Sequence, residues 1–215
     1  MRSYDQFCGL AKALDVVGDR WSMLIVRELL LRGPARYTDL LKGLPGIATN
    51  LLATRLRDME AAGVVAREEA PPPVATTLFR LTEWGEQLRP IVQALGRWAG
   101  PLMGSSASGD ACRGHWLAMP LESMLTDRTP RGAPVRVELR VPRDEQPMIL
   151  ETAGGGVRVR PSSGEKADAV LAGPPEVIIG LLAGRIDLAT ARARRLRLTG
   201  NAAVLKRFVP RTTNL

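Results

Sequence analysis

The chain has 215 residues, of which 45% are hydrophobic and 24% charged, a composition that excludes collagen, a coiled coil and wholesale disorder. Two cysteines are too few for a disulfide framework, and the lack of a long apolar run or a signal-type N-terminus predicts a cytoplasmic protein with no membrane span. The 30 basic and 22 acidic residues give a net charge of +8, which favours a polyanionic partner but does not locate its site.

The first half of the chain has mostly helical periodicity. Apolar residues at helical spacing predict four helices, over residues 11–17, 21–30, 37–41 and 49–62. Two strand-like runs follow, over residues 64–68 and 77–81, and the three prolines at 71–73 suit the long tip of a hairpin. Thr82 then begins a further helix, whose apolar stripe comprises Leu88, Ile91, Val92, Leu95 and Trp98.

A short polar segment, residues 104–110, divides the chain and is typical of a linker. We therefore expect two domains, over residues 1–103 and 111–215. The second half alternates between strand and helix signals. Residues 135–141 alternate apolar and charged side chains, which predicts a sheet with one wet face, and three glycines at 154–156 predict a hairpin turn. A strand ending at Ala172, a helix opened by Pro174-Pro175, a strand over 196–198 and a helix over 201–208 complete an α+β domain with a mostly antiparallel sheet.

The order of elements in the first half is that of a winged helix-turn-helix, in which the last core helix enters the major groove of DNA. On the helix over 49–62, Leu52, Leu56 and Met59 share one face and predict a core contact. The opposite face fits either base contacts or an ordinary solvated surface, and Arg55 either contacts a phosphate or pairs with Asp58. The candidate DNA-binding residues are Arg36, Lys42, Thr49, Asn50, Ala53, Thr54, Arg55, Arg57 and Arg80.

Six segments occur in a fixed order in the first half: Cys8–Leu31 with its Gly18-Asp-Arg-Trp21 core, Tyr37–Leu40, Gly46–Leu52, Arg55–Arg57, Glu60–Gly63 and Leu81–Gly85. Together they resemble the HxlR family of bacterial winged-helix regulators, related in fold to MarR, over about residues 7–100. The resemblance implies a DNA-binding transcriptional regulator, which we expect to be a repressor. It also implies a homodimer joined through the first helix and the long helix after the wing, and a palindromic operator. Taken alone, the stripe from Leu88 to Trp98 fits a domain core as well as a dimer contact.

Two departures from the family pattern concern the DNA contact. Ala48 stands where the family usually has serine, which predicts that the helix cap passes to Thr49. Val74-Ala75-Thr76 stands where the family often has an arginine before the second wing strand, so Arg67, Arg80 or the helix must supply more of the phosphate contacts.

Cys8 and His115 are the candidates for further chemistry. Cys8 stands where some members of the family carry an oxidant-sensing thiol, and a helix start with Lys12 one turn away suits a lowered thiol pKa; a buried, inert cysteine is the alternative. His115 is the only histidine, and no hydrolase, metalloprotease or phosphate-loop motif is present. We therefore expect no enzyme activity, no metal and no cofactor.

Two segments of the second half, Val170–Asp187 and Leu196–Leu205, resemble the sterol-carrier-protein type 2 fold. That fold encloses an apolar tunnel between a five-stranded sheet and its helices, which implies a lipid-like or other hydrophobic effector. The residues that line such a cavity, or alternatively fill an ordinary core, are Trp116, Met119, Met124, Val177, Ile178, Leu181 and Leu182. A basic cluster, Arg192, Arg194, Arg195 and Arg197, fits an acidic head group, DNA phosphates or a solvated face.

The leading hypothesis is a ligand-responsive regulator that binds double-stranded DNA. Two other classes of protein remain open at this point. One is a redox or electrophile sensor that switches through Cys8, and the other is a lipid carrier whose winged helix binds protein.

Overall fold

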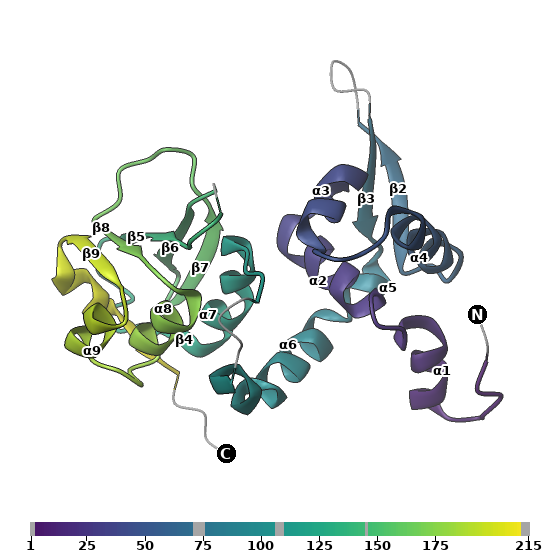
Figure 1. The fold of residues 1–215 in the computed structure, drawn as a ribbon, viewed down its shortest axis with the longest axis horizontal. Helices are drawn as coiled ribbons and strands as arrows, with labels where there is room; N and C mark the ends of the chain where they lie inside the picture. The colour runs from purple at the N-terminus through teal and green to yellow at the C-terminus, as the bar shows by residue number, and fades with distance from the viewer. Residues whose placement is uncertain (1–2, 71–75, 106–109, 145, 212–215) are drawn as a thin grey trace. The chain divides into compact units, whose positions relative to one another are not determined.

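The computed structural model describes residues 3–70, 76–105, 110–144 and 146–211 (Figure 1). The chain divides into two compact units, Met1–Leu95 and Gly96–Leu215. Residues 106–109, the middle of the expected linker, lie outside the described residues. The expected domain boundaries stay a prediction. Within the described ranges, no helix has the length and apolar character needed to cross a bilayer.

Four helices begin the first unit and supply most of its core. They are α1 (Gly9–Val17), α2 (Ser22–Arg32), α3 (Tyr37–Gly43) and α4 (Thr49–Ala61). The buried side chains of α2, α3 and α4 include Ile25, Leu29, Leu40, Leu52, Leu56 and Met59. The four predicted helices and the predicted core face of α4 are thereby confirmed. Gly63 follows α4 with a φ of +77°, a left-handed conformation that glycine adopts without steric penalty and that ends the helix.

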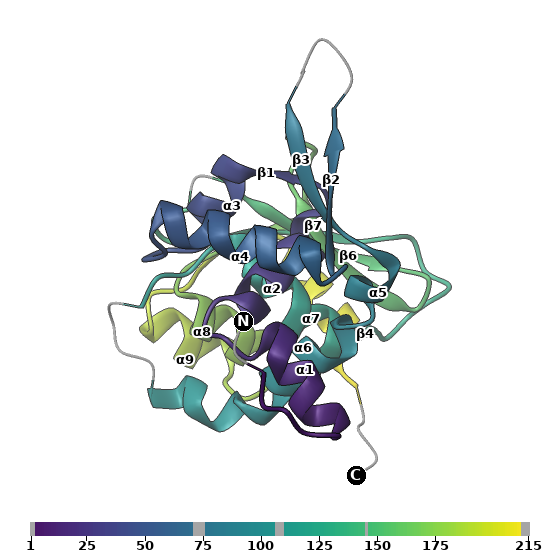
Figure 2. The same ribbon diagram turned by 90° about the vertical axis from the view of Figure 1, so that its right-hand side faces the viewer.

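A three-stranded antiparallel sheet forms the wing, with strand order β1-β3-β2. Its strands are β1 (Ala35–Arg36), β2 (Val65–Glu69) and β3 (Thr77–Leu81). The hairpin strands are confirmed, whereas β1 was not predicted, because two residues are too few to show a strand pattern. Figure 2 shows β2 and β3 extending beyond α4. The proline-rich tip and Val74-Ala75 lie outside the described residues.

The single helix predicted after the wing is wrong, because the chain forms two helices there, α5 (Glu83–Glu86) and α6 (Arg89–Trp98). Pro90 accounts for the break, since proline has no N–H to donate and its ring clashes with the carbonyl one turn earlier. Thr82 caps α5 by accepting a hydrogen bond from the Gly85 N–H at 3.0 Å. Gly85 packs so closely against the Val64 carbonyl that a Cβ at this position would overlap it, which fixes α5 against the end of α4 and the start of the wing.

The second unit contains a five-stranded sheet of order β7-β6-β5-β8-β9. The strands are β5 (Arg136–Arg140), β6 (Met148–Ala153), β7 (Gly156–Pro161), β8 (Ala169–Ala172) and β9 (Arg197–Gly200). Only the β5–β8 pair is parallel, so the predicted mostly antiparallel sheet is confirmed. Gly154 and Gly155, with φ of +56° and +85°, form the turn of the predicted β6–β7 hairpin.

The remaining elements of this unit are short helices and one extra pair of strands. They are η1 (Gly100–Ser105), η2 (Gly114–Leu117), α7 (Ala118–Met124), β4 (Leu125–Asp127), α8 (Pro175–Leu182), α9 (Leu188–Ala193), η3 (Ala202–Arg207) and β10 (Phe208–Pro210). Strands β4 and β10 pair antiparallel to each other, and α8 contacts α9, beside which it lies in Figures 1 and 2.

Three details differ from the sequence predictions. Glu138, expected on a wet face, is buried, because β5 is the central strand and Arg140 folds over its carboxylate. Helix α9 was not predicted, although Asp187 caps it by accepting a hydrogen bond from the Thr190 N–H at 2.7 Å. The predicted last helix is a 3₁₀ helix, and Phe208 belongs to a strand because it pairs with Asp127.

A bidentate ion pair joins β4 to the end of η3. The Arg207 guanidinium donates from Nε to Oδ1 and from Nη2 to Oδ2 of Asp127, both at 2.8 Å. The Asp127 side chain is 3% exposed. The hydrogen bonds from Arg207 lower the pKa of the Asp127 carboxyl from its usual value.

Candidate nucleic-acid interface

Three polar side chains follow the outward face of α4. Asn50 and Arg57 are exposed and Thr54 is half-buried. The Thr54 hydroxyl donates to the main-chain carbonyl of Asn50 at 2.9 Å, the Asn50 side-chain oxygen accepts from the Leu51 N–H at 2.9 Å, and Arg57 Nη2 donates to the Thr54 Oγ1 at 3.4 Å. The three side chains are therefore neighbours on one face, opposite the buried leucines of the same helix. This face offers an amide, a hydroxyl and a guanidinium, the groups that bind base edges and phosphates.

The start of α4 lacks a side-chain cap. The N-cap residue is Ala48, whose side chain has no acceptor, and Thr49 is already the first helical residue, so the predicted transfer of the cap to Thr49 is wrong. Thr49 is exposed, and its carbonyl accepts a hydrogen bond from the Tyr37 hydroxyl, which ties the start of α3 to the start of α4. Ala53 is half-buried on the next turn. Helix N-termini carry a partial positive charge, which attracts phosphate.

The two arginines of α4 have different surroundings. Arg55 is half-buried and pairs with Asp58 at 3.1 Å and with Asp19 at 3.7 Å, so it links α4 to the segment before α2. This geometry favours the ion-pair alternative for Arg55. Arg57 forms no ion pair with any residue in the described ranges, which leaves its positive charge on the surface without a neighbouring carboxylate.

The wing arginines are paired with glutamates. Arg80 contacts Glu68 at 3.0 Å and Arg67 contacts Glu60 at 3.0 Å, which reduces the positive potential of the wing strands. Arg36 is exposed at the end of β1. It borders an open hollow of about 470 Å³ between the wing and the start of α3, whose lining residues are Arg36, Tyr37, Thr38, Arg67, Thr76, Thr77 and Phe79. This hollow was not predicted from the sequence, because it depends on the pairing of β1 with β3.

A buried carboxylate joins α2 to α3. Glu28 is fully buried and accepts hydrogen bonds from Arg27 Nη2 at 2.9 Å and from Arg32 Nε at 3.1 Å. Arg27 also donates to the carbonyl of Gly43, at the end of α3. A Cβ on Gly43 would overlap the Glu28 carboxylate. Lys42, the remaining candidate on α3, is exposed one residue earlier. Glu28 was not predicted from the sequence, where its signal was a lone acidic residue flanked by arginines in an apolar helix.

Large apolar side chains are exposed on α1 and α6. Leu10 of α1 is 68% exposed and Trp98 of α6 is 78% exposed. Figure 1 shows α1 projecting from α2 and α4. Further exposed apolar residues on or near these two helices are Tyr4, Phe7, Leu14, Ile91 and Leu95. Most of the predicted stripe on α6 therefore does not lie in a core of the described chain.

Cys8 is exposed at the N-cap position of α1. The backbone N–H groups of Ala11 and Leu10 lower the pKa of its thiol. Lys12 was expected to lower the thiol pKa through its positive charge, but its Nζ lies 3.8 Å from Asp15 Oδ2 and pairs with that carboxylate.

The candidate effector residues come from three elements of the second unit, η2, α7 and α8, and η2 contacts each of the other two. Val177, Ile178 and Leu182 are buried in α8. The others are half-buried: Trp116, Met119, Met124 and Leu181. The structure therefore places the seven residues on neighbouring elements. Among the described residues, no group of three or more histidine, cysteine, aspartate or glutamate side chains is placed to hold a metal ion.

The chain matches two family models and several curated regulators. The HxlR-like helix-turn-helix model matches residues 16–106, and the SCP-2 sterol transfer family model matches residues 128–210. The HTH-type transcriptional regulators YkvN and YvaP of Bacillus subtilis are 36% and 35% identical to this chain over 43% and 41% of its length, and over 78% and 81% of their own. YodB of the same organism, also an HTH-type transcriptional regulator, is 31% identical over 42% of this chain and 80% of its own length.

Proposed function

The chain belongs to the HxlR-like helix-turn-helix family, and from that premise we propose that it is a transcriptional repressor whose α4 enters the major groove of an operator. The observation that carries the proposal is the outward face of α4, where Asn50, Thr54 and Arg57 share one side of the helix and, among the residues that the structure describes, no carboxylate pairs with Arg57. The 13 residues of α4 span about 20 Å, enough for several base pairs. Arg36, Lys42, Thr49 and Ala53 complete the proposed contact surface around this face. Arg55 supports α4 through its ion pairs with Asp58 and Asp19, and Arg80 pairs with Glu68 across the wing strands.

We infer a homodimer from the exposed apolar surface of α1 and α6. Contiguous exposed apolar side chains on a protein surface are typical of an association site, and here they occupy the two helices expected to join subunits. A twofold symmetric dimer presents two copies of α4, so the operator is expected to be an inverted repeat.

The SCP-2 domain is the proposed site of a hydrophobic effector, bound by the seven residues of η2, α7 and α8 named above. An effector changes DNA affinity only if it binds the DNA-bound and free states unequally. We place the protein with the chromosome in the cytoplasm, and we propose that it acts by binding rather than by catalysis.

Selection of genomic fragments by the purified full chain, with and without cell lipid extract, tests this function. The expected result is enrichment of a common inverted repeat, and a change in enrichment when extract is added. An Asn50→Ala/Arg57→Ala variant is expected to lose the enrichment, whereas Arg158→Ala, which removes an exposed charge from β7, is expected to keep it. A wild-type protein that enriches no sequence contradicts the proposal.

The lowered pKa of the Cys8 thiol favours a second candidate function, an oxidant- or electrophile-sensing regulator. A thiolate is the form that oxidants and electrophiles attack. Under this alternative, Cys8→Ser protein binds the operator normally but no longer responds to oxidant, while Cys112→Ser keeps the response. An unchanged response in Cys8→Ser protein eliminates it.

A further inference from the structure

The excess positive charge of the second half is confined to its last segment. Residues 104–184 contain nine basic and ten acidic residues, whereas residues 185–211 contain eight basic residues and one acidic residue, Asp187. The whole charge excess of this half therefore lies in and around α9, β9 and η3.

Four of these basic residues form one corner of the fold, at the junction of α9 and β9. Arg192, Arg194, Arg195 and Arg197 are all exposed, and none of the four forms an ion pair with any residue in the described part of the chain. Elsewhere in the same unit, three arginines of the sheet are neutralised: Glu151 pairs with Arg136 at 3.4 Å and with Arg160 at 3.0 Å, and Glu138 pairs with Arg140. The α9–β9 corner is thus a concentrated, uncompensated positive surface.

The corner is held in a defined conformation. Leu196 is buried, and its N–H donates to the Ala191 carbonyl at 3.0 Å. A Cβ on Gly173 would lie 3.1 Å from the Leu196 Cα, so the loop after β8 packs tightly against this turn. Arg197 pairs with Ala172 in the sheet. The guanidinium groups therefore extend from a fixed backbone, which reduces the entropy lost when they bind a ligand.

Arg195 occupies a backbone position that favours glycine. Its φ is +69°, and its N–H donates to the Arg192 carbonyl at 3.0 Å, which together with the bond from Leu196 makes a Schellman motif at the end of α9. A side chain at this position is strained, because its Cβ approaches the following carbonyl. The corner therefore carries an arginine where the backbone alone would favour glycine.

The chemistry of the corner suits a phosphodiester backbone better than a lipid surface. Arginine binds phosphate oxygens with two parallel hydrogen bonds. Surfaces that bind lipid bilayers add exposed aromatic or aliphatic side chains to their cations. In the described residues from 185 to 211, no large hydrophobic side chain is exposed.

We propose that the α9–β9 corner is a second DNA-binding surface, which contacts the phosphates of duplex DNA without reading its sequence. The inference rests on the proposed function, because binding of α4 to an operator raises the local concentration of duplex around the tethered second unit. Four arginines supply up to four phosphate contacts, and this term is independent of sequence and strongly dependent on salt.

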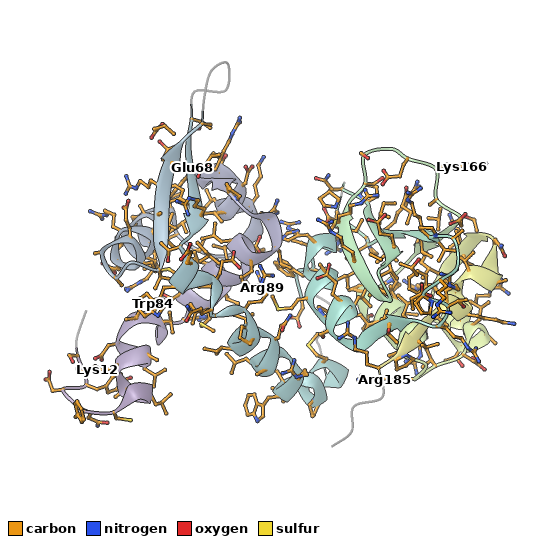
Figure 3. All side chains as sticks on the ribbon, turned by 180° about the vertical axis from the view of Figure 1, so that it is seen from behind. Lys12, Glu68, Trp84, Arg89, Lys166 and Arg185 are labelled. Carbon is orange, nitrogen blue, oxygen red and sulfur yellow. The ribbon has the colours of Figure 1, made fainter. Side chains whose placement is uncertain are left out.

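The test compares two doubly substituted full-length proteins with equal charge. Arg192→Gln/Arg194→Gln removes two charges from the corner. Arg158→Gln/Lys166→Gln removes two exposed charges that form no ion pair with any described residue. Arg158 lies on β7, the sheet edge opposite β9 and about 19 Å away at the usual strand spacing. In Figure 3, Lys166 lies at the opposite end of this unit from Arg185, which comes three residues before the start of α9.

The measurement is the dissociation constant for operator and for random duplex, as a function of salt concentration. Each phosphate contact contributes about 0.9 to the slope of log K against log salt, so the corner variant is expected to lose about 2 from this slope on both DNAs. The charge-matched control is expected to keep the wild-type slope. Arg195→Gly is expected to lower the slope by about 1 without lowering the melting temperature, because it removes the charge and also the backbone strain.

Equal slopes for the corner variant and the control overturn the inference. Loss of binding to phosphatidylserine vesicles in the corner variant, with an unchanged DNA slope, also overturns it and assigns the corner to lipid. Failure of the proposed function gives a different pattern: no sequence is preferred over random duplex, and Asn50→Ala/Arg57→Ala changes nothing, whatever the slope of the corner variant. Thermal melts of each variant show whether it is folded.

Discussion

Replacement of Arg57 by alanine separates DNA contact from folding. The side chain is exposed, and its hydrogen bonds to the Ala53 carbonyl and the Thr54 hydroxyl are both long, at 3.4 Å. Surface substitutions without buried partners change the free energy of unfolding by about 0.5 kcal/mol or less. An arginine that binds a base edge or a phosphate contributes about 1 to 3 kcal/mol to complex formation, or roughly 5- to 150-fold in affinity. We therefore expect Arg57→Ala to bind operator much more weakly and to unfold almost as the wild type does.

Arg55→Ala is the matched control, because it removes the same charge from the same helix. Its ion pairs with Asp58 and Asp19 are partly buried, and their loss is expected to lower the free energy of unfolding by about 1 kcal/mol. Its direct effect on operator affinity is expected to be the smaller of the two.

Fluorescence anisotropy with a labelled operator and urea unfolding followed by circular dichroism measure the two effects independently. The reasoning fails if Arg57→Ala binds operator as the wild type does. It also fails if the affinity lost by Arg57→Ala is matched by an equal loss of stability, since the side chain would then act through the fold.

Three further predictions concern stability and assembly. Ala48→Ser supplies the missing side-chain acceptor at the start of α4 and is expected to raise the free energy of unfolding by about 1 kcal/mol in urea titrations; an unchanged midpoint contradicts it. Asp127→Asn is expected to cost about 2 kcal/mol near pH 7. Because Arg207 lowers the pKa of Asp127, that contribution is present above about pH 4 and is lost as the pH falls through the lowered value, so the two proteins should converge in acid; a constant difference contradicts this. Leu10→Glu and Trp98→Glu are expected to give monomers in sedimentation experiments and to weaken operator binding, whereas a monomeric wild type would exclude the proposed dimer.

The helix-turn-helix was accessible from sequence because its signals are local. The apolar periodicity of Leu52, Leu56 and Met59 and the closing Gly63 define α4 without reference to any other element. The positions of the polar residues on the outward face follow directly, because a helix fixes the direction of every side chain relative to its neighbours.

Most of the errors arose where the structure depends on contacts between segments distant in sequence. The break before α6 is an exception, because it follows from Pro90, a local signal. The burial of Glu138 could not be predicted, because it depends on β8 pairing in parallel with β5. The strand at Phe208 likewise requires its pairing with β4.

The features of the candidate site also fall into two groups, those that local sequence predicts and those that depend on contacts between distant segments. The exposed face of α4 was predicted from periodicity, while the engagement of Arg55 by Asp19 joins residues 36 positions apart and was not predicted. The hollow beside Arg36 and the buried carboxylate of Glu28 also require tertiary contacts. The exposed face of α4 can therefore be predicted from the local sequence, whereas the tertiary contacts that hold the helix in place cannot.

The contact between Glu28 and Gly43 restricts the order in which this protein can evolve. A methyl group at position 43 meets a carboxylate that two arginines hold in place, so a change there is selected against while Glu28 remains. If a shorter residue replaces Glu28 first, the same change at 43 becomes tolerable. The two positions are therefore expected to be epistatic: descendants that differ at position 43 should differ at position 28 as well, whereas a change at position 28 alone is allowed.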